Sequence, residues 1–266
     1  MPRIALGIEY DGSEFFGWQA QRGQRSVQAA VADAVSRVAD ERVVVHGAGR
    51  TDTGVHALQQ VAHFDTRAAR TARQWVLGVN SNLPDDVRVQ WAQQVPDDFD
   101  ARRSALHRRY RYLLLQAPVD SPLLRRRVWR IRDALHVPAM SAAALAWLGE
   151  NDFSSFRAAA CQSRTPLRRL LSVSVARRGR LVAIELVANA FLHHMVRNLV
   201  GTLVEIGTGR APVAFAAELL AARDRRLGPE TAPACGLTLI DVAYPEHYAI
   251  PPAAPRDTWR NAQDDT

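Results

Sequence analysis

The spacing of apolar and polar residues predicts a series of strands and helices in the first third of the chain. Every second residue from Ile4 to Tyr10 is apolar, as in a strand with one buried face. Ser26 can cap a helix whose valines recur at helical spacing. The predicted elements are, in order, a strand at 3–10, a helix at 27–39, strands at 43–45 and 59–65, a helix at about 71–78 and a strand at 87–95.

The rest of the chain shows the same order of elements without a repeat of the sequence itself. Arg178-Gly179 lies between two apolar runs and predicts a hairpin. The elements expected here are a strand at 108–115, a helix at 140–148, strands at 167–176 and 181–187, helices at 191–206 and 213–222, and a strand at 237–243.

This order predicts an α+β fold of two β-α-β-β-α-β (ferredoxin-like) halves with mainly antiparallel sheets. The halves are residues 1–105 and 106–247, and residues 248–266 form a tail rich in Pro and Asp. Hydrophobic residues make up 47% of the 266, so the chain can bury a sizeable core.

Cysteine content and the missing targeting patterns indicate a cytoplasmic protein. Cys161 and Cys235 are too few and too far apart for a disulfide scaffold, and they fit reduced thiols. The first residues lack the pattern of a signal peptide, and no uncharged stretch has the length of a membrane span. We therefore expect no membrane partner.

The charge of the chain points to a polyanion. The net charge is +7, and every Lys or Arg position is Arg, which excludes Schiff-base and P-loop lysines. Ten arginines and one acid, Asp120, lie between residues 101 and 132. A solvated face is the ordinary reason for such a run, but this imbalance next to aromatic residues favours a nucleic acid.

Residues 47–57, Gly-Ala-Gly-Arg-Thr-Asp-Thr-Gly-Val-His-Ala, form a glycine-rich loop between two predicted strands. A dinucleotide-binding loop would need glycine in place of Asp52 and a helix after it. Glycines let a substrate approach the backbone, and the loop holds the acid Asp52 close to the base Arg50. The residues alone leave a catalytic loop and a flexible connection equally open.

Aromatic residues on the strand at 108–115 offer a second candidate site. Tyr110 and Tyr112 share a face with Arg108. The ordinary interpretation is a half-buried strand with aromatic core residues. The functional one is a ring that stacks on a base, worth roughly 1–3 kcal/mol, with arginines nearby for phosphates.

The segment Phe191 to Gly201 predicts a core helix that carries His193 and His194. Adjacent residues point to different sides of a helix, so the two imidazoles are not expected to share a metal. A structural or RNA-contacting role fits them better than zinc, and the sequence contains neither the zinc-protease nor the zinc-deaminase motif. No metal site is predicted.

Eight segments in this order resemble the bacterial tRNA pseudouridine synthase A family, from Ile4 to about Tyr248. Each is modest alone, and together they are very specific. They are Ala5–Gly12, Phe16–Gln19, Gly47–Ala57, Val95–Arg102, Arg109–Tyr112, Gly149–Phe153, Cys161–Pro166 and Phe191–Gly201.

The resemblance implies a cofactor-free isomerase with the pseudouridine synthase fold and a central cleft. It would act as a homodimer on uridines 38 to 40 of the tRNA anticodon stem-loop. Asp52 corresponds to the catalytic carboxylate, Tyr110 to the tyrosine against the target base and Arg197 to the arginine near the acid. The family's RNA contacts correspond to Arg50, to Phe99, Asp100, Ala101, Arg102 and Arg103, and to Ala160, Cys161, Gln162, Ser163 and Arg164.

The implied reaction breaks the N1–C1′ bond of uridine and forms a C5–C1′ bond. It consumes no water or redox equivalent, so it requires no cofactor. The target base must leave its stack, which costs a few kcal/mol. We hypothesise that Arg197 keeps Asp52 ionised when the base covers it.

Two other functions are compatible with the order of elements. An RNA-recognition module has the same order, but the chain lacks its glycine- and aromatic-rich motif, and Asp52 would then have no role. An RNA methyltransferase would need a cofactor-binding loop, which the sequence does not show.

Overall fold

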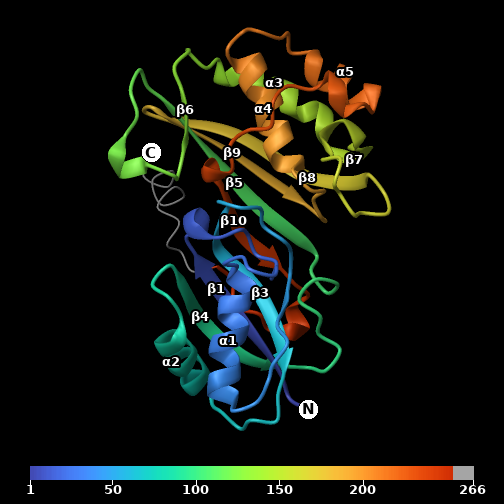
Figure 1. Cartoon of the computed structure of the whole chain (residues 1–266). Coiled ribbons are helices and arrows are strands. Elements are labelled where there is room, and N and C mark those ends of the chain that lie inside the picture. Colours follow the sequence, from blue (N-terminus) through green and yellow to red (C-terminus); the bar gives the residue numbers. More distant parts are fainter. Residues whose placement is uncertain (254–266) are drawn as a thin grey trace.

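The computed structural model describes residues 1–253, and their strands form one mixed sheet that runs the length of the molecule (Figure 1). The strand order along the sheet is β4-β1-β3-β10-β5-β9-β8-β7, while β2 pairs with β3 and β6 pairs with β5. All pairings are antiparallel except β10 with β3 and β5 with β6. The predicted α+β class with mainly antiparallel strands is confirmed.

The first half of the chain builds one end of the sheet. Its elements are β1 (Arg3–Tyr10), α1 (Val27–Ala39), β2 (His46–Gly47), β3 (His56–Asp65), α2 (Ala72–Asn82) and β4 (Val87–Val95). The Ser26 hydroxyl caps α1, and Thr71 and Gln74 form a capping box at the start of α2. Both helices bury their apolar faces, α1 through Val31 and Val35 and α2 through Trp75 and Val79.

The second half builds the other end. Its strands are β5 (His107–Gln116), β6 (Trp129–Ile131), β7 (Gly149–Asp152), β8 (Leu167–Arg178), β9 (Leu181–Ala188) and β10 (Leu237–Ala243), and its helices are α3 (Val137–Ala144), α4 (Met195–Gly207) and α5 (Phe215–Ala222). The predicted hairpin joins β8 to β9 through Gly179, whose φ of 54° is left-handed. Helix α4 is the most deeply buried of the three, with Leu199 and Leu203 fully covered.

The last strand, β10, joins the two halves. Thr238 and Leu239 pair in parallel with His56 and Ala57 of β3, while the other edge of β10 pairs with β5. A strand from the second half of the chain therefore lies beside the strand that follows the glycine-rich loop. This places the loop next to the second half of the molecule.

One predicted strand is absent, and several predicted bounds differ from the observed ones; the helix expected at 140–148, for example, spans Val137–Ala144. Residues 43–45 are not a strand, because side chains of α1 satisfy their backbone. The Ser36 hydroxyl accepts from Val43 N, and the Gln28 amide donates to Val45 O. The helix predicted from residue 191 begins at Met195, since His194 before it has a left-handed φ of 63°. The sequence could not show where this helix begins, because its start depends on the backbone conformation at His194.

The predicted tail begins with residues that pack on the first half. Tyr248 is buried against Phe99, with 5.1 Å between ring centroids, and Gln59 donates to Pro251 O at 2.9 Å. The rest of the predicted tail, residues 254–266, lies outside the described residues. Among residues 1–253, no helix is both long and apolar enough to cross a bilayer.

Candidate active site

Residues of the first half hold the loop that carries Asp52 through contacts with Thr51. Tyr10 Oη lies 2.8 Å from Thr51 Oγ1, and Trp18 N donates to Thr51 O at 3.0 Å. Gly17 has a φ of 82°, and a Cβ there would lie 2.4 Å from Thr51 O. The loop can therefore approach this segment only where a side chain is absent. These contacts involve Thr51, and the side chain of Asp52 beside it stays 21% exposed.

Arg197 from α4 reaches the carboxylate from the second half of the chain. Its Nη1 donates to Asp52 Oδ2 at 2.9 Å, and its Nε donates to Ala232 O at 2.7 Å. The side chain of Arg197 is 16% exposed. Because one edge of the guanidinium is held by a carbonyl, the other is aimed at Asp52 and forms a charge-assisted hydrogen bond with it.

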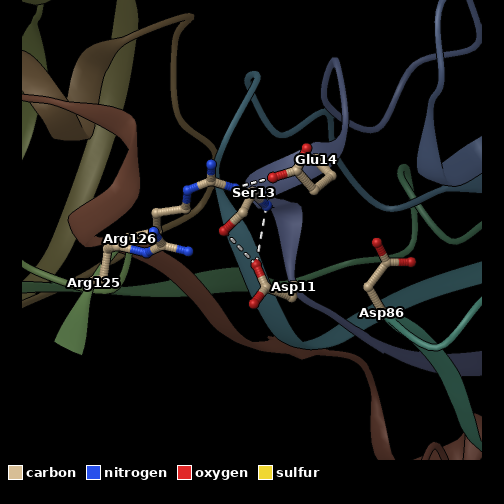
Figure 2. Close-up of a pocket in the computed structure, with 6 residues that line it drawn as sticks. All are labelled: Asp11, Ser13, Glu14, Asp86, Arg125 and Arg126. Carbon is tan, nitrogen blue, oxygen red and sulfur yellow. Dashed lines mark hydrogen bonds and ion pairs between the residues drawn. The ribbon is translucent and has the colours of Figure 1, made fainter. Parts of the chain in front are cut away.

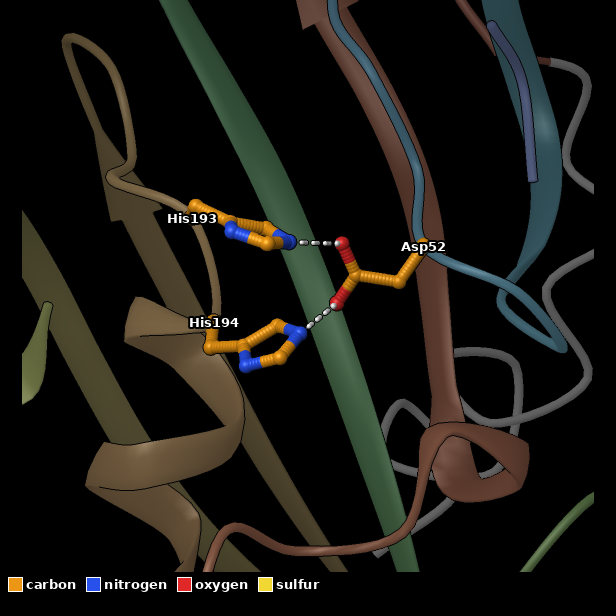
Figure 3. A group of neighbouring side chains, drawn as sticks. All are labelled: Asp52, His193 and His194. Carbon is orange, nitrogen blue, oxygen red and sulfur yellow. Dashed lines mark ion pairs between the residues drawn. The ribbon is translucent and has the colours of Figure 1, made fainter. Parts of the chain in front are cut away.

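Two histidines contact the same carboxylate, as Figure 3 shows. His193 Nε2 lies 3.3 Å from Asp52 Oδ1, and His194 Nε2 lies 3.4 Å from Asp52 Oδ2. The prediction that the imidazoles point to different sides was wrong, since the pair precedes the helix. The left-handed backbone of His194 brings the ring centroids to 4.0 Å. Burial is the main cause that lowers the pKa of His194, which favours its neutral form.

Asp52, His193 and His194 have donor atoms within 4.8 Å of one another and could hold a metal ion. Carboxylate and imidazole are donor types that zinc accepts. A divalent cation would, however, compete with Arg197, which already neutralises the carboxylate at 2.9 Å. The donor set therefore fits a proton-handling site better than a metal centre.

Tyr110 lies beside the acid on β5. It is 8% exposed, its ring packs edge-on against Phe191, and nearby Asp52 contributes to its electrostatic environment. Burial first, and the negative charge of Asp52 second, raise the pKa of Tyr110 far above 10, so its hydroxyl is neutral. No residue among 1–253 hydrogen-bonds this hydroxyl, which leaves it available to a bound molecule.

Two predicted RNA-contacting stretches meet near the loop. Arg50 is exposed, and its Nη1 donates to Gln162 Oε1 at 3.1 Å. Arg157 shapes the second stretch by donating to Cys161 O and to Ser163 O, each at 2.7 Å. Within this stretch Ala160, Gln162 and Arg164 are exposed, and Cys161 and Ser163 are partly buried.

The third predicted stretch, residues 99–103, divides into buried and exposed residues. Phe99 and Ala101 are fully buried, so their side chains pack inside the protein and do not reach its surface. Burial would raise the pKa of Asp100, but the N–H groups of Arg103 and Arg102 outweigh it and lower the pKa. Arg102 and Arg103 are exposed and are the members that can meet a phosphate.

Part of the basic cluster at residues 101–132 serves to join the halves. Arg126 pairs with Glu14, Arg127 donates to Asp11 Oδ2 at 2.7 Å, and His56 Nε2 lies 2.7 Å from Arg126 O. Figure 2 shows Arg125 and Arg126 facing the acidic residues of the first half, across a cavity of about 250 Å³. These ion pairs reduce the positive charge that remains for an RNA partner.

Comparisons with known proteins match the chain to a family. The profile of the family described as tRNA pseudouridine synthase covers residues 7–102 and 143–245. This chain belongs to that family. The tRNA pseudouridine synthase A of Klebsiella pneumoniae subsp. pneumoniae is 52% identical over 249 residues, 94% of this chain and 92% of that protein. The protein of the same name from Escherichia coli (strain K12 / DH10B) is 51% identical with the same coverage.

The predicted family is therefore confirmed, and with it the isomerase class. Nothing in these matches supports an RNA-recognition module. A solved archaeal box H/ACA ribonucleoprotein complex has a TM-score of 0.35 and 13% identity, covering 76% of this chain and 43% of that one. A likeness at this level adds nothing to the functional argument.

Several residues of the site escaped sequence reasoning. Tyr10, Gly17 and Trp18 were quoted only as family-like segments, although they hold the Asp52 loop. His193 and His194 were predicted to lie within a helix, with no contact to Asp52 proposed for them. Their sequence contains no signal for a left-handed residue, because that backbone state is favoured by Gly or Asn far more than by His.

Proposed function

We propose that this protein isomerises uridines 38 to 40 of the tRNA anticodon stem-loop to pseudouridine, with Asp52 as the catalytic carboxylate. One observation carries the proposal. In a chain of the tRNA pseudouridine synthase family, a carboxylate from one half meets Arg197 from the other at 2.9 Å, with Tyr110 nearby. Relatives 51–52% identical to the chain are named tRNA pseudouridine synthase A.

The uridine would leave its stack and lie between Tyr110 and the carboxylate. Stacking on an aromatic ring stabilises the bound base by roughly 1–3 kcal/mol, which offsets the few kcal/mol that base flipping costs. The exposed side chains of Arg50, Arg102, Arg103 and Arg164 would hold phosphates. The buried Phe99 and Ala101 would support this surface from beneath.

The chemistry needs a negatively charged Asp52 when the base excludes water from it. Removal of water raises the free energy of a carboxylate, and a cation within hydrogen-bond distance offsets that cost. Arg197 is such a cation. Asp52 then assists cleavage of N1–C1′, and the base turns so that C5 bonds C1′. C5 loses its hydrogen as a proton and N1 gains a proton from solvent, so the atoms of the uridine are conserved. Tyr110 remains neutral and positions the base by contact.

The proposal extends to assembly and location. We propose a homodimer in the cytoplasm, where tRNA is modified, with residues 1–105 and 106–247 as the two halves that grip the stem-loop. Arg126 pairs with Glu14 and Arg127 pairs with Asp11. These ion pairs would hold the two halves in a fixed relative position while RNA lies across them.

The direct test is release of tritium from tRNA labelled at uracil C5. Wild-type protein should release it, and Asp52→Ala should lower release by about 10⁴-fold, the scale of losing an essential catalytic carboxylate. Asp52→Asn, which preserves the shape, should bind the tRNA with nearly the wild-type Kd in a filter-binding assay. Absence of release by wild type would contradict the enzyme function, and full release by Asp52→Ala would contradict the role of Asp52.

A further inference from the structure

Arg108 on β5 makes four hydrogen bonds with backbone carbonyls, and these carbonyls belong to three different connections. Its Nη2 donates to Ala48 O at 3.0 Å and to Arg102 O at 2.6 Å. Its Nη1 donates to Asn189 O at 2.8 Å and to Ala105 O at 3.4 Å. The side chain is 9% exposed, so these contacts lie inside the protein.

A buried guanidinium is an unusual group to keep without a carboxylate. In the described part of the chain, all partners of Arg108 are carbonyl oxygens, and burial lowers the pKa of Arg108. Arg111, three residues later on the opposite face of β5, has a different environment, since it pairs with Glu185 of β9. A methionine would fill the space at position 108 at lower desolvation cost, so packing alone does not account for the arginine.

Two of the connections that Arg108 touches lead to the candidate active site, and the third carries predicted RNA contacts. Ala48 lies four residues before Asp52, and Asn189 lies four residues before His193. Arg102 belongs to the exposed stretch next to which RNA is expected. The rigid planar fork of Arg108 can hold three backbones at set distances, which a flexible point charge cannot do.

We propose that Arg108 is a positioning residue that sets the Asp52 loop, the stretch at 99–103 and the segment of His193 and His194 relative to one another. This inference rests on the proposed function, because the relative position of these segments matters for activity only if Asp52 is the catalytic carboxylate. Arg108 does not itself contact the reacting atoms. It acts through the backbone of the loops, and its loss should misplace the carboxylate relative to an RNA held at Arg102.

Single-turnover kinetics separate this role from general stabilisation. Misplacement by about 1 Å can cost 10²-fold in rate, so Arg108→Met should lower the rate of the chemical step about 30- to 100-fold. The Kd for tRNA should rise less than about fivefold, because the phosphate-binding side chains remain. Arg108→Lys should recover only part of the rate, since it lacks the fork.

The matched control is the double variant Arg111→Met with Glu185→Met, which removes the buried ion pair on the other face of the same strand. Replacement of both charges by apolar side chains is often neutral for stability. This variant should keep the wild-type rate within about threefold. All rates are compared well below each variant's unfolding temperature.

Hydrogen exchange tests the same proposal without any assumption about activity. Arg108→Met should speed amide exchange in residues 48–55 and 189–194 by about tenfold or more, and the control variant should not. Unchanged exchange in these segments, or equal rate losses in Arg108→Met and the control, would overturn the positioning role. Absence of tritium release by wild type would instead contradict the proposed function, while the exchange result would still decide the role of Arg108.

Discussion

The two halves of the molecule share the order β-α-β-β-α-β, to which the second half adds β6, β7 and α5, but they place their chemistry on different connections. In the first half, residues 48–55 join β2 to β3 and carry Asp52. In the second half, the corresponding connection between β8 and β9 consists of residues 179–180 and forms a tight hairpin. The second half supplies its groups from the connection between β9 and α4, where His193 and His194 precede Arg197.

This difference follows from the lengths of the paired strands. Strand β2 has two residues, so most of the chain before β3 is left as a loop that can reach across the sheet, whereas β8 has 12 residues and pairs almost to its turn with β9. A tight hairpin has no room for a side chain aimed at a neighbouring half. The order of elements therefore does not decide where the chemistry lies, and the lengths of the strands and connections do.

The largest of the following effects should come from removing Arg197, the charged group that the second half contributes to the site. Arg197→Met should lower kcat about 10²- to 10³-fold, the scale of losing one preorganised electrostatic partner. Arg210→Met removes an exposed ion pair just after α4 and should leave kcat within about twofold. A wild-type kcat for Arg197→Met would show that the reaction does not depend on this contact between the halves.

A smaller effect should appear in the dependence of stability on pH. Burial lowers the pKa of His63 in the first half to about 4, and burial also lowers the pKa of His194 in the second. The unfolded chain therefore binds protons that the folded chain does not. The stabilisation is fully present above about pH 6.5 and is lost as the pH falls toward the folded pKa.

Urea unfolding at pH 7 and pH 5 measures this loss. For His63 alone it should be about 1–2 kcal/mol, after allowance for solvent screening. His63→Asn can still accept from Ala101 N, as His63 Nδ1 does at 3.1 Å, and should remove this share of the pH dependence. His247→Asn makes the same change at an exposed position and should leave the pH dependence intact. Equal pH dependence in wild type and His63→Asn would contradict the assignment.

The smallest effect tests the turn that distinguishes the second half. His194 has a φ of 63°, a conformation that a residue with a Cβ adopts at a cost. His194→Gly should therefore be more stable than His194→Ala by about 1 kcal/mol in urea unfolding, while both lose the imidazole. A more stable Ala variant would mean that the left-handed turn is not retained in solution.

Local patterns in the sequence account for most of the elements. Alternation at Ile4 to Tyr10 and the cap at Ser26 predicted β1 and α1 with their observed bounds, and the range of β10 was also predicted correctly. The strand expected at 43–45 was wrong because hydrogen bonds from side chains of α1 satisfy this backbone in place of pairing with another strand. Periodicity reports which side chains are buried, and it does not report which group satisfies the backbone.

The sequence by itself determined most of the elements, the basic charge and, through its eight segments, the family of this protein. Only the tertiary structure decided that β10 lies between β3 and β5, and that His193 and His194 face Asp52. It also brought Asp52 and Arg197 together across 145 residues of sequence. Residues near in sequence constrain one another through backbone geometry, whereas distant ones meet only through the pairing of strands and the burial of α4. The site arises from that second kind of contact.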